Sequence, residues 1–138
     1  MATVEELRAM VGKHGGKSTI QVDKSIIHLF CNTLGDTNAK WKEVGPPGLM
    51  TAAMFVGEGV HMEWPYPAIV DAGADWDFLK PIKLGDVLTV VNSLASVEDK
   101  SSEKGKRLLI TFKSTITNQR GETVAISTGR VMNLMNLG

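Results

Sequence analysis

The chain has 138 residues, enough for one domain with a substantial core and too few for two. Its 15 basic and 15 acidic residues cancel, so nothing in the charge indicates nucleic acid or an anionic membrane as a partner. The single cysteine, Cys31, excludes an internal disulfide and a cysteine-based zinc cluster. No apolar run approaches the ~20 residues that span a bilayer, and the acidic start is unlike a secretory signal. We therefore expect a cytoplasmic protein.

The first part of the chain is predicted to be helical. Thr3 and Glu6 form a capping-box pattern for a short helix that ends near Val11, and residues 19–22 form a short extended piece. Asp23 is placed to cap a second helix, whose apolar residues repeat at helical spacing: Ile26, Ile27, Phe30, Cys31 and Leu34.

A rigid turn, Gly45-Pro46-Pro47-Gly48, then leads into a run of residues 49–56 that carries no charge. Because this run is apolar all round, we expect a buried helix that begins near Pro47. The N–H groups of Gly48 and Leu49 would point out of its N-terminus, where a ligand carbonyl or anion could accept them. The alternative is a proline-capped core helix that binds no ligand.

After Pro67 the spacing of the apolar residues changes from the repeat of a helix to the alternation of strands. A strand is predicted over residues 74–79, with Trp76 and Phe78 on one face. Longer strands are predicted over residues 87–97, 107–118 and 123–132, joined by short turns. Their order predicts an α+β domain over residues 1–138, in which an antiparallel sheet wraps around a long central helix. The apolar faces of Trp76, Phe78 and Val90 also suggest a dimer.

Two segments resemble one known family. Phe78-Leu79-Lys80-Pro81-Ile82-Lys83-Leu84-Gly85-Asp86-Val87-Leu88 is similar to the F-x-x-P-v-x-x-G-D-x-l motif of the MaoC-like dehydratases, and Gly48-Leu49-Met50-Thr51-Ala52 is similar to the H-G-M-L-T-A opening of their central helix. This family has the hotdog fold and includes the R-specific enoyl-CoA hydratases and the dehydratase domain of fatty acid synthase. The resemblance spans roughly residues 20 to 132, although the Gly-Asp bend also occurs in hotdog thioesterases.

The catalytic motif of that family, G-D-x-N-P-x-H, is matched only in part by Gly35-Asp36-Thr37-Asn38-Ala39-Lys40-Trp41. The resemblance implies that Asp36 holds or activates water and that Asn38 orients it. Trp41 stands where the family has its histidine, and an indole cannot act as a general base. We place Trp41 with Gly48 and Leu49 as substrate-binding residues. The alternative for residues 35–38 is a helix C-terminus with an Asx turn.

Among the histidines, His61 follows the predicted central helix and is a candidate for the same tunnel, whereas His28 lies two helical turns before Asp36. Either residue could replace the missing base, although a histidine on a helix or loop is more often structural. No Ser-His-Asp order, phosphate loop, dinucleotide motif or metal-ligand spacing is present, so neither a cofactor nor a metal is expected.

The resemblance implies a hydratase or dehydratase of acyl thioesters such as acyl-CoA, which acts as a homodimer or as the substrate-binding half of a pair with another hotdog chain. Gly48 and Leu49 would then donate N–H groups to the thioester oxygen. One alternative is a hotdog thioesterase with Asp36 as base or nucleophile. Another is a non-catalytic binding subunit of a larger complex.

Overall fold

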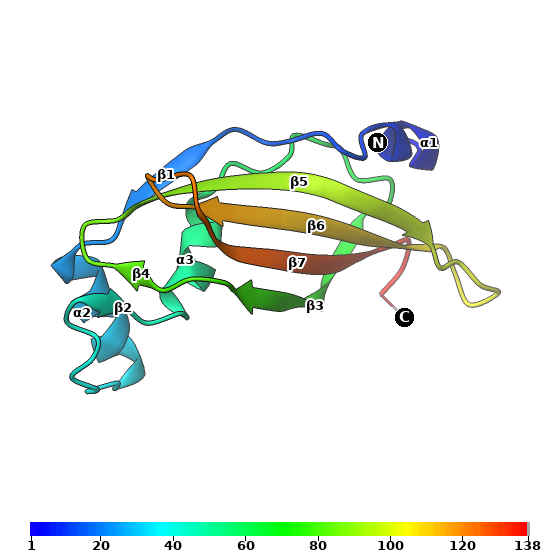
Figure 1. Cartoon of the computed structure of the whole chain (residues 1–138). Coiled ribbons are helices and arrows are strands. Elements are labelled where there is room, and N and C mark those ends of the chain that lie inside the picture. Colours follow the sequence, from blue (N-terminus) through cyan, green and yellow to red (C-terminus); the bar gives the residue numbers. More distant parts are fainter. Residues whose placement is uncertain (138) are drawn as a thin grey trace.

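The computed structural model describes residues 1–137, and within residues 53–56 it describes the backbone alone. Its main layer is an antiparallel sheet with the strand order β1-β5-β6-β7-β3 (Figure 1). These strands are β1 (Ser18–Gln21), β3 (Ala68–Phe78), β5 (Val87–Asp99), β6 (Arg107–Thr117) and β7 (Thr123–Leu134). A small second sheet pairs β2 (Val44–Gly45) with β4 (Ile82–Lys83).

The predicted meander of three long strands is confirmed as β5, β6 and β7, which pair in sequence order. β3 is longer than predicted and begins at Ala68, not Ala74, because its pairing with β7 extends past a bulge between Asp71 and Ala74. Gly73 lies in that bulge with φ at 92°. Long-range pairing with β7 therefore overrides the local Gly and Asp residues, which argue against a strand.

Helix α1 (Val4–Ala9) has the predicted capping box, and α2 (Lys24–Leu34) is capped by Asp23 as expected. The Asp23 carboxylate accepts the Ile26 N–H at 2.8 Å. Gly35 ends α2 in the left-handed region with φ at 68°, a conformation that glycine adopts without steric cost. Together the cap and this glycine fix both ends of α2, which lies at one end of the sheet beside β2 and β4 (Figure 1).

The apolar run after the Pro-Pro turn forms α3 (Leu49–Val56), which is only eight residues long and contacts β1 and β5. Leu49 and Met50 are buried, but Ala52 is exposed, so the prediction of burial all round is wrong at this position. The sheet covers only one side of so short a helix. The burial predicted for residues 53–56 concerns side chains outside the described part of the structure.

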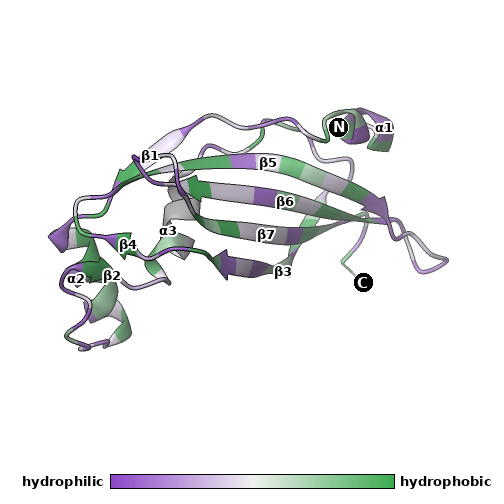
Figure 2. Cartoon of the chain, in the orientation of Figure 1, coloured by the Kyte–Doolittle hydropathy of each residue, from purple (hydrophilic) through white to green (hydrophobic). Residues whose placement is uncertain are grey.

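The core consists of two apolar clusters at the two ends of the sheet. One joins α2 and the start of α3 to the sheet and includes Ile27, Met50, Leu88, Val90 and Ile116. The other lies near α1 and includes Leu7, Tyr66, Leu94 and Leu108. Figure 2 shows the alternation of hydrophobic and hydrophilic residues along the long strands that gives the sheet its core face.

The buried state of Val90 corrects one part of the dimer argument. Val90 is fully buried within this chain, so it offers no surface to a second chain. Phe78 is 45% exposed and Leu79 is 54% exposed. Together with Ile69 and Val70, which lie on β3 and are 47% and 41% exposed, these residues give the edge strand an apolar surface that remains available for pairing.

The bend before β5 explains why a Gly-Asp pair stands there. Gly85 has φ at 93°, which disfavours any residue with a Cβ. Asp86 is buried and accepts the Lys83 N–H at 2.8 Å and the Gln119 amide at 2.9 Å. Burial would raise the pKa of Asp86, but these hydrogen bonds and the charge of Arg120 outweigh it and hold the pKa below its usual value.

None of the helices in residues 1–137 combines the length and the apolar character needed to cross a membrane.

Candidate functional site

The segment that follows α2 lines a hollow of about 560 Å³, which we call the Asp36 hollow. Gly35 turns the chain back on the helix, and the Asp36 N–H donates to the Cys31 carbonyl at 2.8 Å. The next residues then fold against the exposed face of α2. The residues that line the hollow include His28, Asn32, Asp36, Asn38 and Trp41.

Both carboxylate oxygens of Asp36 are engaged within its own loop. Oδ1 accepts the Asn38 N–H at 3.0 Å, which is the Asx turn considered as the structural alternative. Oδ2 accepts the Trp41 indole N–H at 2.7 Å. The Lys40 ammonium lies 4.4 Å from the centre of the Trp41 ring and adds a cation–π contact.

Trp41, the residue aligned with the family's histidine in the sequence comparison above, thus donates a hydrogen bond to the aspartate. An indole N–H donates but cannot accept a proton, so Trp41 orients the loop and is not itself a base. The sequence contained both residues, but their contact across five positions depends on the path of the loop. The successive Asx turns at Asp36 and Asn38, which fix that path, are the only local signal for the contact.

His28 lines the same hollow as Asp36, as its position two turns earlier on α2 suggested. Its Nε2 atom lies 3.0 Å from the Asn32 amide nitrogen, so the side chain one turn later holds the ring in place. Of the two histidine candidates, His28 is thus the one that the fold brings near the aspartate.

His61 lies elsewhere. Its side chain is 89% exposed and its Nε2 atom is 3.0 Å from the Glu58 carboxylate. Glu58 is in turn held beside β1, because its N–H donates to the Ser18 hydroxyl. His61 is not among the residues that line the Asp36 hollow, so the catalytic role predicted for it finds no support in this arrangement.

A second hollow of about 360 Å³ lies on the other side of Trp41, and we call it the Pro47 groove. Trp41 lines both hollows and forms the wall between them. The groove is mainly apolar, and its lining residues include Pro47, Met50 and Phe78. The charged residues Lys40 and Lys80 also line it. Lys80 is paired with the Glu122 carboxylate, so the groove is suited mainly to an apolar chain.

The backbone donors at the start of α3 are only partly free. The Leu49 N–H donates to the Pro46 carbonyl at 2.9 Å, and the Met50 N–H donates to the Pro47 carbonyl at 3.0 Å. For the Gly48 N–H we find no such partner in residues 1–137. Of the two predicted thioester donors, Leu49 thus closes the turn, and Gly48, whose N–H has no partner among the described residues, is not among the residues that line either hollow.

Gly48 also lies close to α2. A Cβ atom at this position would lie 3.1 Å from Cζ of Phe30. A larger side chain at Gly48 would therefore disturb the packing of α2 as well as the approach of a ligand. A Gly48→Val change would thus not test the Gly48 N–H donor alone. Gly48→Ala, which requires Phe30 to move by only a few tenths of an ångström, is the milder substitution.

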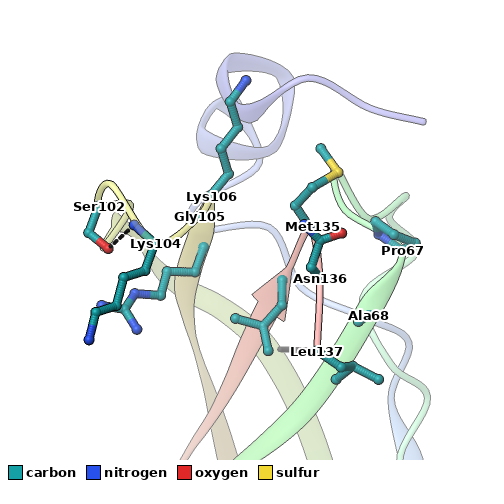
Figure 3. Close-up of a pocket in the computed structure, with 11 residues that line it drawn as sticks. Pro67, Ala68, Ser102, Lys104, Gly105, Lys106, Met135, Asn136 and Leu137 are labelled. Atoms are coloured by element: carbon teal, nitrogen blue, oxygen red, sulfur yellow. Dashed lines mark hydrogen bonds between the residues drawn. The ribbon is translucent and has the colours of Figure 1, made fainter.

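A larger hollow of about 700 Å³ lies at the opposite end of the sheet, between the β5–β6 hairpin and the C-terminal segment (Figure 3). Lys104, Lys106 and Arg107 line it together with apolar residues such as Leu134 and Leu137. In Figure 3 the side chains of Lys104 and Lys106 point in opposite directions. The two lysine ammonium groups therefore do not converge on one point.

Among the described residues, no group of three or more His, Cys, Asp and Glu side chains is placed to hold a metal ion.

Residues 9–127 match the family described as "FAS1-like, dehydratase domain region". The chain belongs to this family. The match includes α2, the Asp36 hollow, the Pro47 groove and most of the sheet, and so contains the whole of the candidate site.

Solved structures with the same fold are MaoC-like dehydratases and related complexes. The MaoC-like dehydratase of Rhodospirillum rubrum is 21% identical, with 91% of this chain and 93% of that chain covered and a TM-score of 0.65. A chain of the ChsH1-ChsH2 complex of Mycobacterium tuberculosis is 16% identical, with 98% and 90% covered and a TM-score of 0.77. A chain of the HadBC (3R-hydroxyacyl-ACP dehydratase) complex of the same organism is 17% identical, with 90% and 97% covered and a TM-score of 0.71. These likenesses confirm the predicted hotdog fold.

One curated relative, the NAD-dependent protein deacylase of Desulfosudis oleivorans, is 35% identical over 71 residues. The matched stretch is 51% of this chain but only 26% of that protein, so the chain spans about a quarter of its length.

Proposed function

We propose that this chain is the substrate-binding half of a hotdog pair that hydrates or dehydrates acyl thioesters at C2–C3, with an acyl-CoA or a similar carrier thioester as substrate. The observation that carries the proposal is the hydrogen bond from the Trp41 indole to the Asp36 carboxylate. It fills the place of an Asp–His pair with a group that cannot exchange a proton at neutral pH. Membership of a dehydratase family supports the reaction class.

Each part of the candidate site has a role in this proposal. The Gly48 N–H donates to the thioester oxygen and stabilises the charge that develops there in the transition state. The Pro47 groove holds the apolar part of the acyl chain, with Trp41 as its wall. Asp36 and Asn38 hold the loop in shape and bind water at its exposed edge. The partner chain supplies the acid and base residues. The complex of the two chains acts in the cytoplasm.

The free edge of β3 is the surface that we assign to the partner. β3 pairs with β7 on one side only, and most of its residues are exposed. The strand contains Asp71, Asp75 and Asp77 but neither lysine nor arginine. Arg130 neutralises only Asp75, at 2.9 Å. Two copies joined along this edge would gather six carboxylates, so a different chain with a basic edge strand is favoured.

The direct test is hydration of crotonyl-CoA, followed as loss of enoyl absorbance. We expect the chain alone to be roughly 10²–10⁴-fold slower than the same chain mixed with a hotdog protein that has an intact Asp…His motif, because general acid–base groups contribute about that much. Trp41→His should raise the activity of the isolated chain. Its matched control, Trp41→Phe, keeps a ring but removes the N–H and should not.

Strong activity of the unmodified chain alone would contradict the assignment and make His28 the first residue to replace. Release of free CoA from saturated acyl-CoA, lost in Asp36→Asn, would instead indicate the thioesterase.

A further inference from the structure

A row that contains three polar residues and ends at Trp76 crosses the core face of the sheet, and we call it the polar row. Asn92 on β5, Ser114 on β6, Ser127 on β7 and Trp76 on β3 lie directly opposite one another in the strand register. Residues that are paired in this way point to the same face of a sheet. The row therefore runs across four strands on the face that carries the core.

The rows on either side are apolar or small. On the side of α3 the row consists of Val90, Ile116, Ala125 and Phe78. On the other side it consists of Leu94, Phe112, Gly129 and Ala74. Val90 belongs to one core cluster and Leu94 to the other. The polar row thus lies where the two clusters meet, in the middle of the sheet.

Two members of the row satisfy each other. The Ser114 hydroxyl donates to the Asn92 side-chain oxygen at 2.6 Å, and the Asn92 amide donates to the Glu58 carbonyl at 3.3 Å. Ser127 differs from both. It is fully buried, and its Oγ atom has no hydrogen-bond partner among the described residues. Leaving a buried hydroxyl unsatisfied costs about 1–3 kcal/mol, so an unsatisfied hydroxyl in a core needs an explanation.

Space is available at the next core-facing position of β7. Gly129, the next core-facing residue of β7, would find no atom within 4 Å of an added Cβ. Ala74, which is opposite Gly129 on β3, is exposed, so this space opens to the surface. Ala125, Ser127 and Gly129 together form a small-residue strip on β7 with one unsatisfied hydroxyl at its centre.

The strip begins at Ala125, which lies opposite Phe78, a lining residue of the Pro47 groove. Trp76 stacks on Phe78 with ring centres 5.7 Å apart, and Phe78 lines the groove. Ser127 lies opposite Trp76, one row beyond Phe78, which is about 7 Å along the strand. An acyl chain that enters along Phe78 would reach Ser127 once the Trp76 ring, which lies opposite Ser127, moves aside.

We propose that Ser127 is a specificity-determining residue, whose hydroxyl donates a hydrogen bond to an oxygen on the acyl chain beyond the reacting carbons. The substrate class is then an acyl thioester whose chain carries a keto or hydroxyl oxygen. This inference rests on the proposed function, because it assumes that the Pro47 groove holds an acyl chain. The bound oxygen would satisfy Ser127, whereas a plain alkyl chain would leave it unsatisfied.

Calorimetric titration tests this proposal. The ligands are octanoyl-CoA and a set of C8 acyl-CoAs, each of which carries one keto group at a different carbon beyond C3. We expect at least one keto compound to bind about fivefold more tightly than octanoyl-CoA, which is the value of one hydrogen bond. In Ser127→Ala this preference should disappear, while the affinity for octanoyl-CoA stays the same. Thr128→Ala, a neighbour that points to the opposite face, is the matched control and should keep the preference.

Thermal unfolding of Ser127→Ala gives a second readout without any ligand. The melting temperature should stay the same or rise, because the substitution removes an unsatisfied buried group. A clear fall would show that the hydroxyl is already bonded within the free protein, for example to an ordered water, and would overturn the proposal. Equal binding of keto and plain thioesters would also overturn it while leaving the proposed function intact. If no thioester binds at all, the proposed function fails and this inference fails with it.

Discussion

At the scale of single residues, Glu122 shows how a short turn can hold the sheet together. Its carboxylate accepts hydrogen bonds from Lys80, from Arg120 at 2.7 Å and from Asn118 at 3.0 Å. Lys80 follows β3, whereas the other two residues flank the turn between β6 and β7. The bonds from Lys80 first, and then from Arg120 and Asn118, lower the pKa of Glu122 to about 2.

This pKa predicts an acid-sensitive contribution to stability. Because the pKa of Glu122 in the folded chain is below its ordinary value of 4.5, the contribution is complete above pH 4.5 and is lost as the pH falls towards 2. Glu122→Gln should therefore reduce the urea midpoint at pH 7 and make it fall less between pH 4.5 and 2. Glu103→Gln, in the exposed β5–β6 hairpin, is the control. An unchanged acid dependence in Glu122→Gln would contradict the assignment.

Trp41 is a single residue that has a comparable local effect in the candidate site. Its indole N–H donates to Asp36 at 2.7 Å, and an indole cannot accept a proton. This hydrogen bond therefore holds the loop in shape without adding a second base.

At the scale of elements, α2 positions half of the candidate site. It carries His28 and Asn32 on the face that lines the Asp36 hollow, and its C-terminal turn places Asp36 itself. Any loosening of α2 should therefore act on the site as well as on stability.

The N-cap of α2 offers a direct measurement of this coupling. Asp23→Ala removes the acceptor of the Ile26 N–H and should lower the free energy of unfolding by about 1 kcal/mol. Asp23→Ser retains an acceptor oxygen and should stay close to the parent. Urea unfolding followed by tryptophan fluorescence measures both variants. If the alanine and serine variants were equally stable, the cap would not contribute as its geometry suggests.

At the scale of the whole molecule, the exposed edge of β3 leaves the fold open to a second chain. Stable specific interfaces bury about 1,200–2,000 Å². In the assembly proposed above, the acidic residues of β3 favour a basic partner over a second copy.

Charge reversal on β3 tests this assembly. With a basic hotdog partner, Asp77→Lys should weaken the complex about tenfold and reduce its salt dependence, because it places like charges opposite each other. Glu103→Lys makes the same charge change away from the edge and should have little effect. Sedimentation of the labelled chain at two salt concentrations gives the dissociation constant of the complex and its salt dependence. A tight homodimer of the unmodified chain at micromolar concentration would contradict the heteromeric pairing.

Much of the fold could be predicted from the sequence because its causes are local. The caps at Thr3 and Asp23, the glycine at position 35 and the alternation along β5, β6 and β7 act within a few residues of one another. The exception is β3, whose first half is a strand only because β7 lies beside it. Local composition carries no signal for such a partner.

The candidate site was predictable only in its list of residues. From the sequence, Asp36, Asn38, Trp41 and Gly48 could be named, but the donors available to a ligand could not. The tertiary structure decided that the Trp41 indole bonds Asp36, that Leu49 closes a turn on Pro46 and that His61 lies apart from both hollows. It also left the Ser127 hydroxyl buried without a hydrogen-bond partner among the residues that the structure describes. Periodicity and capping, which are short-range, therefore determined the elements, whereas loop paths and strand register, which depend on contacts between distant residues, decided which side chains meet.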